Sequence, residues 1–236
     1  MNYRNLTFES FVRLPSSACA YQLCRAVTRS APTGPRVVLL HGLTGVGKTH
    51  LLGATAWAFR LLHPDRRVVV TTAHELRYAL VQAIRVDRVR EFEAGYLDVA
   101  LLVIDDLHTL VDCLGTQDGL ARSVAKWAAA GAHVIGAATS SPETLGVFRS
   151  VLAETLHVRQ CRVARPSRSE IRQIVATLAS GRSMAMSFSS LTKIARNSAG
   201  DVRRALGALT HIEATARLPG GRLAPAWMAR TATGAR

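Results

Sequence analysis

Residues 36–49 constrain the fold of this chain more than any other stretch. Residues 37–40 form a short apolar run that is typical of a buried parallel strand, and residues 42–49 then match the pattern GxxxxGK[ST] in full. Glycines in this pattern let the backbone turn its N–H groups toward a polyphosphate, and a following helix, expected over residues 50–62, points its positive end at the same anion. The sequence therefore predicts a nucleotide-binding loop here rather than a structural turn.

The loop contains the first candidate ligands of ATP and Mg²⁺. We expect the Lys48 ammonium to reach the β- and γ-phosphates and the Thr49 hydroxyl to hold Mg²⁺. The backbone around the phosphates is expected to come from the other motif residues, which are Gly42, Thr44, Gly45 and Gly47.

Strand-like and helix-like stretches alternate along the first two thirds of the chain. Apolar strand-like runs follow at residues 67–72, 99–104, 132–138 and 156–163, and helical patterns fall at 16–28, 73–84 and 119–130. This alternation predicts an α/β fold with a parallel five-stranded sheet flanked by helices. Three further helical stretches, at 169–179, 188–197 and 201–217, predict a small helical subdomain. We therefore expect a nucleotide-binding α/β subdomain at 1–165, a helical subdomain at 166–218 and a short tail at 219–236.

Two adjacent acids, Asp105 and Asp106, follow the third apolar strand. The first carboxylate is placed to hold Mg²⁺, and the second to orient or polarise an attacking water. The pair could instead cap the next helix, but the loop upstream favours the catalytic interpretation. Thr139 follows the next strand, and its hydroxyl either contacts the γ-phosphate or forms a turn. Because chemistry in parallel sheets lies at the carboxyl ends of the strands, we expect Thr49, Asp105 and Thr139 at one edge.

The charge of the chain favours an anionic partner. It carries 30 Lys and Arg against 16 Asp and Glu, a net charge of +14. Nucleic acid is the simplest such partner, and the alternative is a solvated basic surface with no partner. A charged segment at residues 85–93 contains three of the arginines, Arg85, Arg88 and Arg90. The alternative for this segment is that its arginines pair with its own acids, which are Asp87, Glu91 and Glu93.

Cysteine usage and hydropathy exclude several classes of protein. The four cysteines are scattered, without a CxxC pair, which predicts free thiols in a reducing cytosol and no zinc site. The first residues lack the apolar core of a signal peptide, and no apolar stretch is long enough to span a membrane. We therefore expect a cytoplasmic protein without a membrane partner.

Together these parts resemble the AAA+ ATPases, and within them the family of the bacterial replication initiator DnaA. The resemblance covers nearly all of residues 5–217. Residues 5–12 are similar to the opening segment of the family, which implies that Phe11 and Val12 contact the adenine. The sequence Thr49-His50-Leu51-Leu52 is similar to the end of its phosphate loop, which implies that His50 belongs to the nucleotide site.

The resemblance extends to the second motif and to two sensor positions. Residues 99–107 resemble the second motif of the family, and Thr139 matches its sensor-1 position. Arg203 lies in a Val-Arg…Gly-Ala-Leu context that resembles sensor 2, which implies an arginine that closes over the phosphates. Without the resemblance, Arg203 is equally well interpreted as a surface arginine. The helical subdomain is implied to be a lid, and the 85–93 segment to face the central channel of an assembly.

Three departures from the family are visible. We expect no C-terminal helix-turn-helix domain, because the given chain ends soon after residue 217. Counting back from Pro166 places Glu154 where the initiator has its arginine finger, with Arg149 and Arg159 as flanking candidates. Residues 1–15 hold no sliding-clamp-binding peptide of the kind found in Hda-type regulators, so a clamp partner is not supported.

The resemblance implies a DnaA-like protein that binds ATP and Mg²⁺, hydrolyses ATP slowly and acts in the initiation of chromosomal replication or in its regulation. DNA and a DnaA-like or other replication protein are the implied partners, and a nucleotide-dependent homo-oligomer stays open. Two alternatives also stay open. One is an ATP-dependent helicase loader or transposition helper of the DnaC/IstB kind, and the other is a non-hydrolysing DNA-binding adaptor.

Overall fold

The computed structural model describes residues 6–29, 36–111, 113–146, 150 and 158–216. The chain divides into two compact units, residues 1–165 and residues 166–236. Among the described residues, no helix is long and apolar enough to cross a lipid bilayer.

The first unit is built on a parallel five-stranded sheet, as the sequence predicted. Its strands are β1 (Val37–His41), β2 (Arg67–Thr72), β3 (Val99–Asp105), β4 (His133–Ala138) and β5 (Val158–Arg162). They lie in the order β2-β3-β4-β1-β5. The first strand is therefore flanked by the last two strands, so the segments that meet at the loop after β1 are far apart in the sequence.

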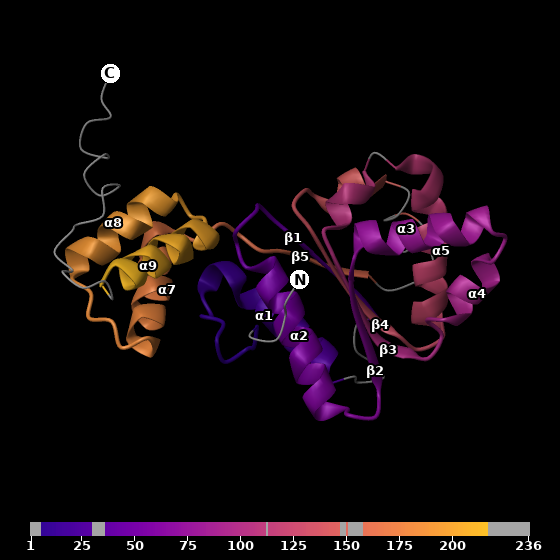
Figure 1. Cartoon of the computed structure of the whole chain (residues 1–236), viewed down its shortest axis with the longest axis horizontal. Helices are drawn as coiled ribbons and strands as arrows, with labels where there is room; N and C mark the ends of the chain where they lie inside the picture. The colour runs from indigo at the N-terminus through magenta and orange to yellow at the C-terminus, as the bar shows by residue number, and fades with distance from the viewer. Residues whose placement is uncertain (1–5, 30–35, 112, 147–149, 151–157, 217–236) are drawn as a thin grey trace, which may run out of the picture. The chain divides into compact units, whose positions relative to one another are not determined.

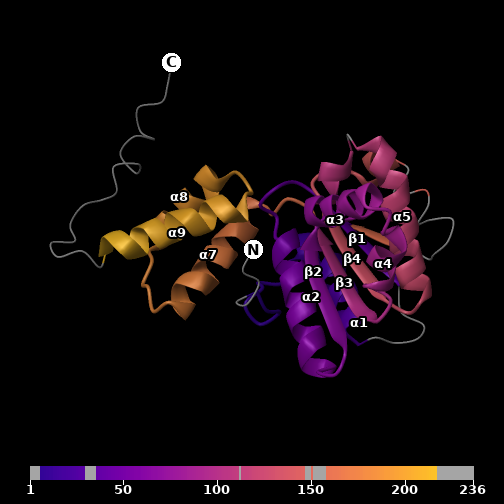
Figure 2. The same ribbon diagram turned by 45° about the vertical axis from the view of Figure 1, so that its right-hand side comes forward.

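Helices cover both faces of this sheet (Figures 1 and 2). On one face lie α1 (Ala18–Thr28), which follows the short 3₁₀ turn η1 (Pro15–Ser17), and α2 (Lys48–Leu62). On the other lie α3 (Ala73–Arg85), α4 (Val89–Ala94), η2 (Leu107–Leu110) and α5 (Leu114–Ala129). A last 3₁₀ turn, η3 (Pro142–Leu145), follows β4.

The side chains of successive strand residues lie alternately on the two faces of the sheet. In β1, Val38 and Leu40 pack with α1 and α2, whereas Val37 and Leu39 pack with the helices of the other face. Because both faces are buried, the strands are continuous apolar runs rather than alternating ones. This explains why the central strands were recognisable from the sequence.

Most element boundaries differ from the prediction by at most two residues, and two regions differ more. The α5 helix begins at Leu114, five residues before the predicted start at 119. The charged segment at 85–93 is not one element, because it contains the end of α3 at Arg85, a turn with Asp87 at φ 54°, and most of α4. That turn brings Arg88 N–H to the Ala83 carbonyl at 2.8 Å, which ends α3 sharply.

The described part of the second unit is helical. It contains α7 (Arg168–Gly181), α8 (Phe188–Ser198) and α9 (Val202–Ala216), as the sequence predicted for this region. Ser167 caps α7 by accepting a hydrogen bond from Glu170 N–H, while the Glu170 carboxylate accepts one from Ser167 N–H. The predicted tail at 219–236 lies outside the described residues.

Candidate nucleotide-binding site

The strand order brings three predicted parts of the site to one edge of the sheet. In parallel pairings β4 lies between β3 and β1. Asp105 is the last residue of β3, Thr139 directly follows β4, and the loop at 42–49 directly follows β1. The structure therefore places Asp105, Thr139 and the loop side by side, at the carboxyl edge where ligands bind in sheets of this kind.

Glycine is required in the loop for two different structural reasons. Gly45 and Gly47 adopt φ of 78° and 102°, in the region that favours glycine. Gly42, at φ 151°, is also required by its neighbour, because a Cβ there would lie 2.3 Å from the Val163 carbonyl oxygen. The first glycine of the motif thus permits β5 to approach the loop, which the phosphate-binding pattern alone did not reveal.

The Lys48 side chain forms hydrogen bonds to the first residues of its own loop. Its side chain is 8% exposed, and its ammonium donates hydrogen bonds to the carbonyls of Gly42 at 2.7 Å and Leu43 at 2.8 Å. A buried ammonium needs such acceptors, because its desolvation would otherwise be costly. The positive charge is therefore already fixed at the start of α2, where the backbone N–H groups of the first turn also attract an anion.

Thr49 and Asp105 are in direct contact although 56 residues separate them. The Thr49 hydroxyl donates to Asp105 Oδ2 at 2.8 Å, and Asp106 N–H donates to Asp105 Oδ1 at 2.8 Å. Burial is the largest influence on the pKa of Asp105 and raises it above the ordinary value, although both hydrogen bonds act in the opposite direction. A divalent cation beside this carboxylate would offset the cost of keeping it ionised.

The donor set fits Mg²⁺. A hydroxyl and a carboxylate oxygen are hard ligands of the kind Mg²⁺ prefers, and this ion ordinarily keeps several waters and takes further oxygens from substrate phosphates. Among the described residues, no group of three or more His, Cys, Asp or Glu side chains is placed to hold a metal. The Thr49–Asp105 pair is therefore suited to an ion that arrives with a nucleotide, not to a metal held by protein ligands alone.

Asp106 occupies an unusual backbone conformation next to this pair. Its φ is 56°, in the left-handed region, and its side chain is 50% exposed. The His108 Nδ1 atom lies 4.0 Å from Asp106 Oδ1 and has no hydrogen-bond partner among the described residues. The two acids are thus in different environments, one buried against Thr49 and the other facing solvent.

The segment before α1 packs on the start of α2. His50 Nε2 lies 2.9 Å from the Thr7 carbonyl and 3.2 Å from Ser10 Oγ. The Phe11 ring lies edge-on to the His50 ring at 5.2 Å, and Phe11 is also the side chain nearest to a Cβ at Gly47. This brings Phe11 beside the loop and leaves it partly exposed, as is Val12. Adenine contact by these two residues stays a prediction.

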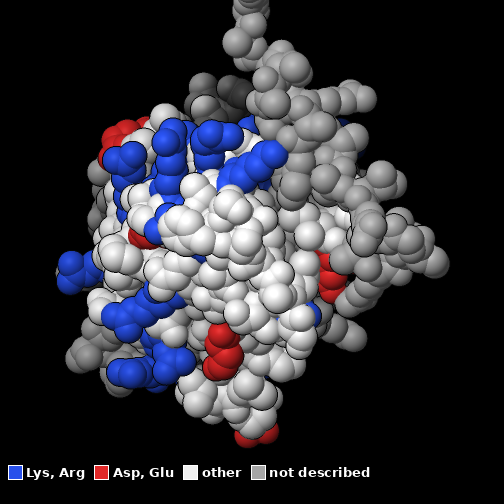
Figure 3. Space-filling model, turned by 90° about the vertical axis from the view of Figure 1, so that its left-hand side faces the viewer, with Lys and Arg blue, Asp and Glu red and all other residues white. Residues whose placement is uncertain are grey.

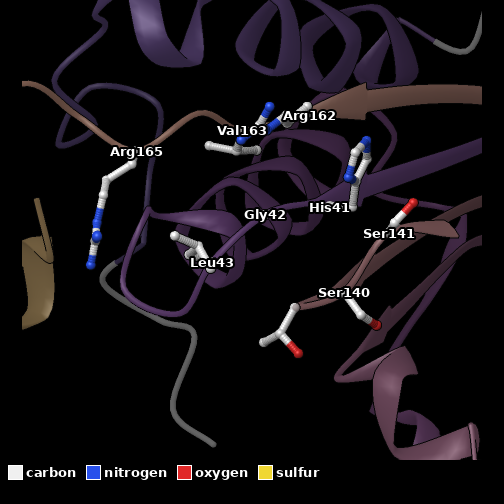
Figure 4. Close-up of a pocket in the computed structure, with 9 residues that line it drawn as sticks. His41, Gly42, Leu43, Ser140, Ser141, Arg162, Val163 and Arg165 are labelled. Carbon is white, nitrogen blue, oxygen red and sulfur yellow. The ribbon is translucent and has the colours of Figure 1, made fainter. Parts of the chain in front are cut away.

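A pocket lies next to Thr139, and most of the residues that line it were not among the predicted site residues. The pocket touches the loop at Gly42 and Leu43 (Figure 4). Its other lining residues are His41, Thr139, Ser140, Ser141, Arg162, Val163 and Arg165. His41 and Arg162 are register partners on β1 and β5, a pairing that only the strand order creates.

The roles of the remaining predicted residues stay predictions. Arg203 is exposed near the start of α9, in the second unit, and its role as sensor 2 stays a prediction. Glu154 and Arg149 lie outside the described residues. Arg159 is exposed on β5.

Comparison with known proteins shows which family the sequence matches. The sequence pattern of the family described as the bacterial DnaA ATPase domain matches residues 2–159. The chromosomal replication initiator protein DnaA of Desulfotalea psychrophila is 30% identical over 220 residues, which cover 91% of this chain and 45% of the relative. That of Caulobacter vibrioides is 32% identical over 139 residues, which cover 59% of this chain and 28% of the relative. The chain therefore spans about half or less of the length of these curated relatives.

Solved structures share the fold. Domain III of the Thermotoga maritima replication initiation protein DnaA matches with a TM-score of 0.78 at 24% identity, over 92% of both chains. A replication initiator DnaA bound to AMPPCP and single-stranded DNA matches with a TM-score of 0.78 at 20% identity, over 89% of this chain and 65% of that one. The Aeropyrum pernix Orc1 protein in complex with DNA matches with a TM-score of 0.73 at 20% identity, over 95% of this chain and 67% of that one.

Proposed function

We propose, from the premise that this chain belongs to the bacterial DnaA ATPase-domain family, that it is an ATP- and Mg²⁺-binding protein of bacterial replication. It would act in the cytoplasm, in initiation or its regulation, together with DNA and a DnaA-like or other replication protein. The relatives are named as chromosomal replication initiators. Their family favours this function over that of a helicase loader or transposition helper.

One observation carries the nucleotide proposal. Thr49 at the start of α2 and Asp105 at the end of β3 meet at 2.8 Å, and Lys48, which precedes Thr49, is buried. A bound Mg²⁺–ATP would supply the metal charge and the phosphoryl group that is transferred to water. Lys48 and the backbone N–H groups of the loop bind and orient the phosphates, while Thr49 and Asp105 hold the metal. A DnaA structure of the same fold is bound to AMPPCP, which supports ATP as the ligand proposed here.

The test is ATP binding measured by isothermal titration calorimetry. Lys48→Ala removes the ammonium that pairs with the phosphates, so ATP affinity should fall about tenfold or more. Lys126→Ala is the control, because Lys126 is an exposed lysine that pairs with Glu93 on the α4–α5 side of the sheet. Equal ATP affinities for wild type and Lys48→Ala would refute the proposed site.

Slow hydrolysis is the second part of the proposal. The exposed Asp106 carboxylate would orient the attacking water, Thr139 would contact the γ-phosphate from β4, and Arg203 would close over the phosphates from the helical unit. If ATP binds without turnover, the protein would act as the non-hydrolysing adaptor instead.

The third part of the proposal is DNA binding through the arginines around α4. Arg85 and Arg90 are exposed and have no ion pair among the described residues, whereas Arg88 lies 3.6 Å from Glu91. Glu93 is already engaged by Lys126, so it is not a counter-charge for them. Arg88 is therefore paired within the segment, as the alternative expects, and the exposure of Arg85 and Arg90 supports phosphate binding by these two. Elsewhere too, Lys and Arg predominate over Asp and Glu, as on the face in Figure 3.

The salt dependence of binding to single-stranded DNA tests this part. Replacing Arg85, Arg88 and Arg90 by Ala should lower the slope of log affinity against log salt by about 2, at about 0.7 for each lost phosphate contact on a single strand. ATP affinity should not change. A matched triple variant of exposed arginines, Arg60, Arg66 and Arg122, controls for net charge. If both triple variants lose affinity and slope equally, only the net charge matters and the segment has no special role.

A further inference from the structure

The pocket beside Thr139 has a volume of about 350 Å³ and opens at the carboxyl ends of β1, β4 and β5. Figure 4 shows His41 and Arg162 near each other at one end of it, Ser140 and Ser141 below them, and Arg165 beyond Leu43. Two guanidinium groups, one imidazole and the hydroxyls of three consecutive residues thus line a single hollow. These are side chains that bind oxyanions.

The strand register explains why His41 and Arg162 meet. They are direct partners in the parallel β1–β5 pair. The preceding residues, Leu40 and Cys161, pack into the core on the α1–α2 side. Because side chains alternate along a strand, His41 and Arg162 both emerge on the opposite face of the sheet. The backbone therefore fixes the two side chains next to each other.

This end of the pocket has an excess of positive charge. Neither Arg162 nor Arg165 forms an ion pair within the part of the chain that the structure describes. The pKa of His41 is below its ordinary value, and burial is the largest cause. The charges of Arg162 and Lys48 also lower this pKa, whereas the charge of Glu143 raises it. Arg162 thus acts on the imidazole beside it, and a bound anion would offset the charge of its guanidinium.

We infer that this pocket binds a phosphate group at a second site, which adjoins the loop at 42–49 through Gly42 and Leu43 and lies next to Thr139. The planar guanidinium of Arg162 can donate two parallel hydrogen bonds to phosphate oxygens, and the hydroxyls of Ser140 and Ser141 can donate others. The volume exceeds that of one bare phosphate, so the site admits either free inorganic phosphate or the phosphodiester of a nucleic acid. This site goes beyond the proposed function, in which Arg162 takes no part.

The test compares two arginines of one strand. Arg162→Gln removes the guanidinium from the pocket, while Arg159→Gln removes the same charge from the same strand, three residues away on its other face. Inorganic phosphate and a short single-stranded oligonucleotide are titrated separately into the full chain by calorimetry at constant ionic strength. Arg162→Gln should weaken binding about tenfold, the loss expected for a hydrogen bond to a charged group, and Arg159→Gln should change it less than about twofold.

The arms distinguish the sources of the phosphate group. A loss confined to inorganic phosphate identifies a site for the free ion, a loss confined to the oligonucleotide identifies a backbone contact, and a loss in both identifies a site that accepts either. Equal effects of the two variants, or no effect in either arm, would overturn the inference. So would competition between phosphate and AMPPCP in the wild type, because it would make the pocket part of the nucleotide site. Lys48→Ala should weaken the binding of AMPPCP without weakening the binding of phosphate. Failure of the proposed nucleotide site and failure of the proposed phosphate site are therefore distinguishable.

Discussion

Replacing Gly42 by Ala should destabilise the first unit, because a Cβ there would lie 2.3 Å from the Val163 carbonyl oxygen and 3.3 Å from its carbonyl carbon. Ordinary contact would require a backbone displacement of roughly 1 Å. Neither side can move freely, since Gly42 N–H donates to the Ala138 carbonyl and Val163 N–H donates to the His41 carbonyl at 2.7 Å. Overpacking of this kind costs about 1–3 kcal/mol, and the positive φ of Gly42 adds about 1 kcal/mol for a residue with a side chain.

Gly131→Ala is the matched control. Gly131 also has a positive φ, of 115°, but a Cβ there would meet no atom within 4 Å. It should therefore cost only the backbone contribution, about 1 kcal/mol. The difference between the two variants, about 1–3 kcal/mol, isolates the clash with β5.

Urea unfolding followed by tryptophan fluorescence measures the difference. Trp127 is buried in the first unit, so it reports on the unit that contains both glycines. If Gly42→Ala and Gly131→Ala lower the free energy of unfolding equally, the close approach of Val163 is not what requires glycine at 42. If Gly42→Ala weakens only ATP binding, the glycine serves the phosphates alone, and our interpretation of the strand contact is wrong.

Two further predictions concern the acids and the histidine of the site. Asp106→Asn should leave ATP bound and slow turnover, while Asp105→Asn should weaken the Mg²⁺ dependence of ATP binding; equal ATPase rates for wild type and Asp106→Asn would show that the role of Asp106 is misassigned. Burial lowers the pKa of His50 in the folded protein, although its hydrogen bond to the Thr7 carbonyl acts in the opposite direction. As the pH falls, the His50 imidazole is therefore protonated first in the unfolded chain. The free energy of unfolding should then decrease as the pH falls below about 6.5. In His50→Gln this loss, measured as the melting temperature between pH 7.5 and pH 5.5, should be smaller than in a control variant of the exposed His74; an unchanged loss would contradict the prediction.

Much of the local structure follows from residues that are close in sequence. β2 begins and ends where predicted, because its valine-rich run ends at Thr72, which caps α3 by accepting a hydrogen bond from Glu75 N–H. The parallel sheet and the family could also be recognised from sequence, since the loop at 42–49 and the acids after β3 are contiguous motifs. The start of α5 was missed by five residues, because residues 114–118 include Gly115 and Thr116, which are weak helix formers.

The same distinction between local sequence and tertiary structure applies to the candidate site. Sequence alone predicted Lys48, Thr49 and Asp105 as site residues, because each belongs to a motif whose chemistry requires that residue type. It also placed Thr139 at a strand end, but not the strand order that puts β4 between β3 and β1. That order results from packing of whole strands and helices, which no local pattern encodes.

The sequence by itself therefore determined the glycine-rich loop at 42–49, the alternation of strands and helices and the family, because these depend on neighbouring residues. Only the tertiary structure decided that Thr49 donates a hydrogen bond to Asp105, that Gly42 must admit Val163, and that His41 lies beside Arg162. Each of these contacts joins segments that are tens of residues or more apart. Their geometry follows from the pairing of β1 with both β4 and β5, which is set by burial of the two sheet faces and not by any single motif.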